Sequence, residues 1–155
     1  MRNIIESEYN KLGGGAFGST YEKDGLLYKV TKDEKEVSIC NKILKSNKEF
    51  ITLPKIYKVR KGKNRYIIVR EMLTMLKPTY MAKVSNMHEH INEYIFENSQ
   101  SSKGLLIKFL DEKFINFLDK LKEELTEINS FNRFIDIHSG NIGIDKNGNL
   151  ILFDF

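Results

Sequence analysis

Two aspartates and one asparagine near the end of the sequence have the types and order of a metal-dependent site. Asp136 and Asn141 lie at the two ends of a short loop. Asp154 follows two short apolar runs that predict a hairpin. Such a hairpin would return Asp154 to that loop, so that two carboxylates and an amide converge. Mg²⁺ takes oxygen ligands of this kind together with substrate phosphates, and a carboxylate that holds no metal could orient a nucleophilic hydroxyl. The pattern therefore indicates magnesium-assisted chemistry on a phosphate compound.

A glycine-rich segment near the start could serve the same chemistry. Its residues are Gly13, Gly14, Gly15, Ala16, Phe17 and Gly18. They fit G-x-G-x-x-G, but we predict strands on both sides, whereas the dinucleotide-binding fingerprint must open a helix. The segment suits instead a flap whose backbone amides lie over phosphates. The alternative is a plain hairpin turn, since glycine serves those as well.

The first half of the chain predicts a small sheet with one helix. Short strands are expected near residues 8–12, 19–23, 26–30, 56–59 and 66–69. The glycine-rich turn and an Asp24-Gly25 turn would join the first three strands as an antiparallel meander. A helix should begin near Asp33, because aspartate is a good N-cap and the apolar residues after it have helical spacing. The result would be a five-stranded antiparallel sheet.

The second half predicts helices followed by the hairpin. We expect a helix over about 83–97, a loop at 98–104 and an amphipathic helix from Asp111. The apolar stripe of that helix is made of Phe114, Phe117, Leu118, Leu121, Leu125 and Ile128. The fold class is then α+β, with one domain over 1–73 and another over 74–155. Because little cover is predicted for the stripe, we expect a homodimer, or a partner that buries part of 105–125.

Composition excludes several classes of protein. Of 155 residues, 41% are hydrophobic and 30% are charged, which is typical of a globular chain. No apolar run approaches the roughly 18 residues of a membrane helix, and the first residues contain no signal-peptide core, so we expect a cytoplasmic protein without a membrane partner. Cys40 is the only cysteine, which excludes an internal disulfide and any multi-cysteine zinc site. The charges behind the net +4 are interspersed, which disfavours a nucleic-acid partner.

A resemblance follows from the order of these motifs. Over nearly its whole length the chain resembles the protein-kinase-like superfamily. Gly13–Gly18 resembles the glycine-rich loop, Lys29 the β3 lysine, and Glu36 the glutamate of helix αC. The resemblance implies that Lys29 meets the α and β phosphates of ATP and forms an ion pair with Glu36. Glu34 is the competing partner for that lysine.

The same resemblance covers the middle and the end of the chain. Glu71 and Leu73 fall in a segment that resembles the hinge, where the adenine of ATP is bound. Asp136 and Asn141 match the catalytic loop, and Asp154 with the phenylalanine after it matches the first two positions of D-F-G. The resemblance implies a protein-kinase-like fold that binds ATP and Mg²⁺. Asp136 would be the catalytic base, and Asn141 and Asp154 the metal ligands.

The catalytic loop departs from the usual pattern in two places. Phe134 and Ile135 precede Asp136, so the arginine that normally pairs with a phosphorylated activation loop is missing. His138 stands where many serine/threonine kinases have lysine, and Asp-x-His-x-Gly-Asn is similar to aminoglycoside phosphotransferases and choline kinases. His138 would either act in catalysis, by contacting phosphate or a carboxylate, or pack and hydrogen-bond within the loop.

The resemblance leaves three functions open. The sequence ends at Phe155, before the glycine of D-F-G and the activation segment, which predicts a minimal kinase with a reduced helical C-lobe. The first expectation is a serine/threonine protein kinase that phosphorylates a protein substrate. The alternatives are a small-molecule kinase of the aminoglycoside or choline type, and a nucleotide-binding pseudokinase that acts on a partner protein.

A second group of histidines is less informative. His88, Glu89, His90 and Glu93 could be drawn as a metal site. A single helix cannot point positions 88 and 90 in the same direction, however, so we expect no metal there.

Overall fold

The structure, a computed structural model, describes residues 8–15, 18–129 and 135–155. It has an α+β fold, as the sequence predicts. Two compact units make up the chain: the first contains the residues up to Asn47 together with Lys55–Met72, and the second contains Lys48–Pro54 and Leu73–Phe155. The division predicted at residue 73 differs mainly in Lys48–Pro54. In the described part of the chain, none of the helices has the length and apolar character that crossing a membrane requires.

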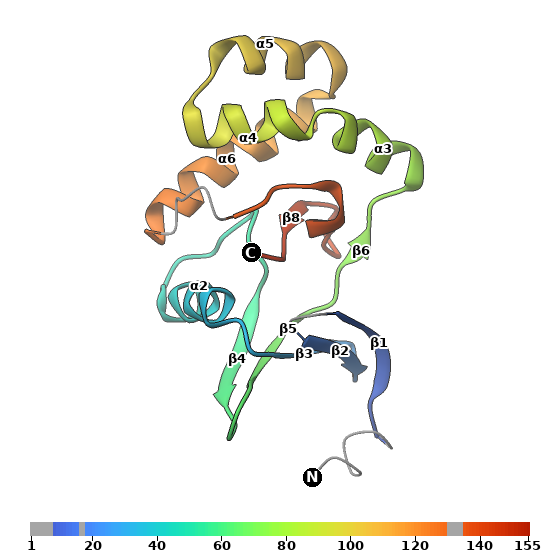
Figure 1. Ribbon diagram of the computed structural model, residues 1–155, viewed down its shortest axis with the longest axis vertical. Coiled ribbons are helices and arrows are strands. Elements are labelled where there is room, and N and C mark those ends of the chain that lie inside the picture. Colours follow the sequence, from blue (N-terminus) through green and yellow to red (C-terminus); the bar gives the residue numbers. More distant parts are fainter. Residues whose placement is uncertain (1–7, 16–17, 130–134) are drawn as a thin grey trace. The chain divides into compact units, whose positions relative to one another are not determined.

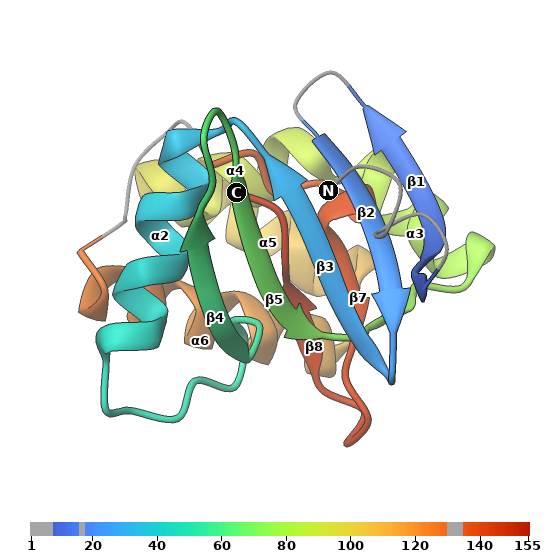
Figure 2. The ribbon, with the colours of Figure 1, turned by 90° about the horizontal axis from the view of Figure 1, so that it is seen from below.

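The first unit is built on the predicted five-stranded antiparallel sheet. Its strands are β1 (Asn10–Gly15), β2 (Gly18–Lys23), β3 (Leu26–Thr31), β4 (Ile56–Lys61) and β5 (Tyr66–Glu71). They lie in the order β1-β2-β3-β5-β4, and every neighbouring pair is antiparallel (Figure 2). In the turn between β2 and β3, Asp24 and Gly25 have φ of 52° and 75°. This is the conformation that Asp-Gly favours in a two-residue hairpin.

One helix, α2 (Glu34–Lys45), packs on this sheet against β4 and β5. It begins where the sequence predicts, because the Asp33 side chain accepts hydrogen bonds from the backbone N–H groups of Lys35 and Glu36. Its buried apolar residues are Val37, Ile39, Cys40 and Ile43. The helix therefore turns one apolar face to the sheet, and burial of that face stabilises the unit.

The helices of the second unit differ from the prediction in two places. They are α3 (Pro78–Asn86), α4 (His88–Glu97), α5 (Gln100–Phe109) and α6 (Glu112–Glu127). The single helix predicted over 83–97 is wrong, because α3 and α4 meet at Met87, whose φ of −102° and ψ of 8° interrupt the helix. Pro78 begins α3 earlier than predicted, since proline is favoured in the first turn of a helix.

The loop predicted at 98–104 is also wrong, because α5 begins inside it. Ser99 is the N-cap of α5, and its hydroxyl accepts a hydrogen bond from the backbone N–H of Ser102. Asn98, just before it, takes the left-handed conformation (φ 56°) that ends α4. Ser102 and Leu106 are buried. Packing of the buried residues and the Ser99 cap together stabilise this short helix.

The predicted amphipathic helix α6 buries its stripe within the second unit. Phe114, Leu118, Leu121 and Leu125 are fully buried. The helix packs against α4, α5 and β8, and α4, α5 and α6 lie together in Figure 1. The stripe is thus covered by its own chain. Because it is not exposed, it gives no reason to expect a homodimer, which stays a prediction.

The predicted C-terminal hairpin is present and belongs to a small sheet. β7 (Ile142–Ile144) pairs antiparallel with β8 (Leu150–Leu152). A third strand that the sequence does not predict, β6 (Thr74–Met75), pairs with β7. A 3₁₀ turn, η1 (Ser139–Asn141), leads into β7.

A buried carboxylate fastens Lys48–Pro54 to the second unit. Glu124 of α6, which is 2% exposed, accepts hydrogen bonds from the backbone N–H groups of Ile51 (2.7 Å) and Thr52 (2.8 Å). It also accepts one from the Thr52 hydroxyl. The backbone N–H of Leu152 donates to the Thr52 carbonyl at 2.8 Å. The segment that joins α2 to β4 in the sequence is therefore held by α6 and β8.

We expect Glu124→Gln to lower the free energy of unfolding by about 1–3 kcal/mol, because its NH₂ group would face a buried N–H donor that then lacks an acceptor. Glu123→Gln is the matched control on the same helix: Glu123 is exposed and pairs with Lys120 at 3.0 Å, and its loss should cost less than about 0.5 kcal/mol. Urea denaturation measures both values. Equal losses in the two variants would contradict the structural role of Glu124.

The turn between β7 and β8 is closed by Asp145. Its carboxylate accepts hydrogen bonds from the backbone N–H groups of Asn147 and Asn149, both at 2.8 Å, and from the Asn149 side-chain amide at 3.0 Å. Burial by itself raises the pKa of Asp145, but hydrogen bonds to the charged carboxylate outweigh it. The pKa of Asp145 therefore lies below its ordinary value of 3.8.

A carboxyl whose pKa is lower in the folded protein than in the unfolded chain stabilises the fold above the unfolded pKa. That contribution is lost as the pH falls through the folded pKa. We expect wild type to be more stable than Asp145→Asn at pH 7, and the difference to shrink once the pH falls below 3.8. Urea denaturation of both proteins at pH 7 and at about pH 2.5 measures this change. A difference that stays constant would show that Asp145 does not act through its charge.

Candidate active site

Lys29 and Glu36 form an ion pair in the first unit. Lys29 lies on β3, and Glu36 lies in the first turn of α2. The Nζ and Oε1 atoms are 2.7 Å apart, and only 14% and 4% of the two side chains are exposed. A carboxylate buried to this extent is strongly destabilising unless it is paired. The ion pair expected from the sequence is therefore present, while its role toward phosphates stays a prediction.

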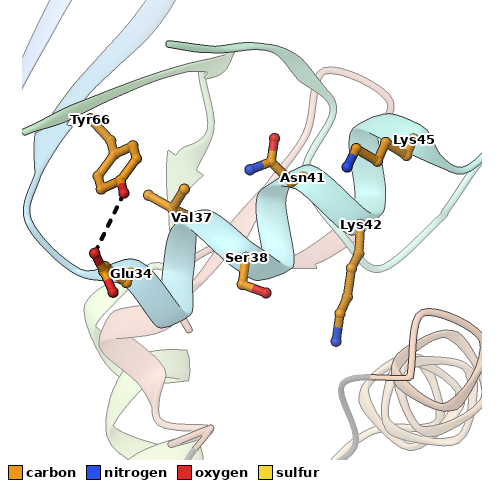
Figure 3. A pocket seen from close by; sticks show the side chains of 7 residues that line it. All are labelled: Glu34, Val37, Ser38, Asn41, Lys42, Lys45 and Tyr66. Carbon is orange, nitrogen blue, oxygen red and sulfur yellow. Dashed lines mark hydrogen bonds between the residues drawn. The ribbon is translucent and has the colours of Figure 1, made fainter. Parts of the chain in front are cut away.

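The competing glutamate, Glu34, bonds elsewhere. Its Oε1 accepts a hydrogen bond from the Tyr66 hydroxyl at 3.5 Å, on one side of an open hollow of about 420 Å³ (Figure 3). The other residues that line this hollow are Val37, Ser38, Asn41, Lys42 and Lys45. Neither Lys29 nor Glu36 lines it, so the hollow is separate from the candidate site.

The glycines at positions 13, 14 and 15 are strand residues and not part of the predicted turn. They end β1 and pair with Thr20, Ser19 and Gly18 of β2. Ala16 and Phe17, which complete the predicted flap, lie outside the described residues. The strands on both sides of the segment are as predicted, so a helix-opening dinucleotide fingerprint is excluded.

Gly15 and Gly18 differ in what surrounds them. A Cβ on Gly18 would lie 2.0 Å from the carbonyl oxygen of Val30, so β3 approaches too closely for any other residue. A Cβ on Gly15 would meet nothing within 4 Å. Of these two positions, packing therefore requires glycine at position 18 and leaves position 15 open. The open backbone at Gly15 suits a strand that a ligand approaches closely.

The predicted hinge residues fall on either side of the boundary between the units. Glu71 ends β5 in the first unit, and Leu73 begins the second. The Glu71 backbone N–H donates to the Lys55 carbonyl at 3.1 Å, and Oε1 of Glu71 accepts from the Lys55 N–H at 2.8 Å. The N–H of Glu71 is therefore not available to an adenine ring.

In the second unit, Asp136 belongs to a group that we call the Asp136 cluster: Asp136, Asn141, His88 and Asn92. The Asn141 Nδ2 donates to the Asp136 carbonyl at 3.1 Å. Within the described residues the Oδ1 of Asn141 makes no hydrogen bond, which leaves it for the expected metal ion. The Phe153 N–H donates to the Asn141 carbonyl at 2.9 Å. The hairpin thus returns to the loop just before Asp154, as predicted.

Two members of the cluster come from α4 and are not predicted by the sequence. The Nε2 of His88 lies 2.7 Å from the Oδ1 of Asp136. Asn92 binds the backbone of Ile137 in both directions: its Oδ1 accepts from the N–H at 3.4 Å, and its Nδ2 donates to the carbonyl at 3.3 Å. Positions 88 and 92 are one helical turn apart and share a face. This spacing is visible in the sequence, but it does not tell which loop the face will meet.

His138 serves the turn of its own loop. Its Nδ1 accepts a hydrogen bond from the Gly140 backbone N–H at 3.0 Å. Its ring centre lies 6.5 Å from that of His88. Of the two roles that the sequence leaves open, hydrogen bonding within the loop is the one observed. Contact with a phosphate or a carboxylate stays a prediction.

The oxygen ligands available for Mg²⁺ are few. Asn141 offers an amide oxygen, and Asp154, which is partly buried, follows β8. Within the described residues, no group of three or more His, Cys, Asp or Glu side chains could hold a metal ion. One amide oxygen and one carboxylate are too few to hold a metal ion alone. They fit Mg²⁺ that is bound together with substrate phosphates.

The candidate residues form two sets in different units. The Lys29–Glu36 ion pair and the glycines are in the first unit, and the Asp136 cluster and Asp154 are in the second. The chain matches no model of a known protein family and no curated protein. The resemblance to protein kinases therefore stays an expectation from the sequence motifs.

We expect Gly18→Ala to destabilise the protein by about 1–3 kcal/mol, because the added Cβ would overlap a backbone atom and force the strands apart. Gly15→Ala is the matched control, since its Cβ meets no atom within 4 Å, and it should change stability by less than about 1 kcal/mol. If the segment lies over phosphates, Gly15→Ala should instead weaken ATP binding. Thermal denaturation with and without ATP separates the loss of stability from the loss of ATP binding. A Gly15→Ala variant as unstable as Gly18→Ala would contradict the expectation.

Proposed function

We propose that this protein is an ATP- and Mg²⁺-dependent phosphotransferase, namely a serine/threonine protein kinase with a protein-kinase-like fold. It would transfer the γ-phosphoryl group of ATP to a protein hydroxyl. The observation that carries the proposal is the buried ion pair between Lys29 and Glu36, at 2.7 Å. A buried ion pair is a poor source of net stability. A lysine whose ammonium group is held by a glutamate between a strand and a helix is well suited to binding phosphates.

On this proposal the first unit binds the nucleotide. Lys29, held by Glu36, neutralises charge on the α and β phosphates, and the backbone of Gly13–Gly15 lies over them. Glu71, at the end of the first unit, and Leu73, the first residue after it, contact the adenine. Because the Glu71 N–H is bonded to Lys55, its contact with the adenine uses the carbonyl.

The second unit supplies the groups that act on the γ-phosphoryl group. As the acceptor oxygen bonds to the γ-phosphorus, the bond to the β–γ bridging oxygen breaks and ADP leaves; Asp136 takes the proton of the acceptor hydroxyl. The Asp136 side chain is 61% exposed, so an acceptor can reach it. Asn141 and Asp154 would hold Mg²⁺, which would neutralise charge on the phosphates.

A small-molecule kinase is the second candidate. It is favoured by the pattern Asp136-x-His138-x-Gly140-Asn141, which is similar to aminoglycoside phosphotransferases and choline kinases. In the structure, the His138–Gly140 hydrogen bond shapes the turn between Asp136 and Asn141. The acceptor distinguishes this candidate from a protein kinase, since both would use the same nucleotide chemistry.

With Mg²⁺ and γ-labelled ATP, wild type is expected to label itself or a generic protein acceptor. Asp136→Asn should lower kcat about 100-fold or more, because the proton acceptor is lost, while ATP binding is retained. Lys29→Met should weaken both ATP binding and transfer. Lys32→Met is the matched control, because Lys32 is an exposed lysine just after β3, and it should change neither.

Binding is measured separately by the thermal shift with Mg²⁺-ATP, since a ligand at 100 times its Kd stabilises by about 2.7 kcal/mol. Transfer that persists unchanged in Asp136→Asn would contradict the proposal. Aminoglycosides, choline and sugars are offered in parallel, and labelling of these alone would favour the small-molecule kinase. A thermal shift without any transfer would favour a pseudokinase that binds nucleotide and acts on a partner protein.

A further inference from the structure

His88 of α4 contacts the side chain of Asp136. The Nε2 of His88 is 2.7 Å from the Oδ1 of Asp136. An ionised carboxylate only accepts hydrogen bonds, so Nε2 carries the proton and donates it. Within the described residues, this is the only hydrogen bond made by the Asp136 carboxylate. One carboxylate oxygen is therefore occupied, and the other, Oδ2, is left to solvent or to a ligand.

The contact contributes little to folding the loop. The side chains of His88 and Asp136 are 41% and 61% exposed, and exposed ion pairs add little to stability. Other residues already hold the loop backbone: Asn92 binds Ile137 in both directions, and Asn141 binds the Asp136 carbonyl. What His88 restricts is the rotation of the Asp136 carboxylate.

We propose that His88 is a positioning residue for phosphoryl transfer. By holding Oδ1 it keeps the carboxylate of Asp136 in one orientation, in which Oδ2 meets the acceptor hydroxyl. Orientation of the reacting groups is a large part of catalysis in a reaction that needs little covalent chemistry from the protein. This inference rests on the proposed function, because it assigns His88 a part in the step that Asp136 performs.

The test compares His88→Leu, His88→Gln and a control, His90→Gln. Leucine removes the donor, whereas the Nε2 of glutamine can take the place of the ring N–H. His90 lies on the same helix but bonds Glu93 and Ser102 and not the loop. We expect His88→Leu to lower kcat roughly 10- to 100-fold with the KM for ATP and the thermal stability unchanged. His88→Gln should recover most of the rate, and His90→Gln should match wild type.

Nuclear magnetic resonance of the histidine side chains tests the contact without turnover. In Asp136→Ala, the ring ¹⁵N and ¹H signals of His88 should shift, while those of His90 should not. If wild type transfers no phosphate, the proposed function fails, and with it the catalytic role of His88, even where the signals show the contact. If wild type is active, the inference alone is overturned by any of three results: a normal kcat in His88→Leu, a kcat above wild type, or no rescue by His88→Gln.

Discussion

A carboxylate that is taken out of water must be given positive charge or N–H donors, and this requirement shapes both units. Glu36 and Glu124 are 3% and 2% exposed. Glu36 is paired with a lysine on β3, so the start of α2 cannot shift along the sheet without leaving a buried charge unpaired. Glu124 is paired with backbone N–H groups of Ile51 and Thr52, so that segment cannot leave α6. The first contact fixes the start of α2, and the second fixes the segment between α2 and β4.

Asp136 shows the opposite arrangement. Its side chain is largely exposed, so desolvation does not decide where it lies. Its position is set by hydrogen bonds to the backbone that follows it: Asn141 donates to the Asp136 carbonyl, and Asn92 makes a reciprocal pair with Ile137. A group that must accept a proton and release it has to stay hydrated and accessible, and it can still be placed accurately if the neighbouring peptide groups are held. This combination is what the proposed chemistry needs from it.

The elements predicted correctly are those whose signal is local. The Asp-Gly turn, the Asp33 cap and the apolar stripe of α6 each specify their conformation through residues a few positions apart. The errors fall where local signals are weak or compete. The polar run around Ser99 is typical of a loop, but Ser99 caps a helix there, and Ser102 and Leu106 of that helix are buried in the second unit. β6 is too short for any periodicity and exists because β7 lies beside it.

The sequence by itself determined the fold class, the five-stranded sheet, the hairpin, and the residue types of the candidate site in their order. It also named Glu36 as the partner of Lys29 and Glu34 as its competitor. Only the tertiary structure decided that His88 and Asn92 meet the Asp136 loop and that Lys48–Pro54 belongs with α6. Both depend on contacts between residues more than 40 positions apart. A helical period shows which side chains share a face, but which distant segment packs on that face is settled by the burial and pairing of the whole unit.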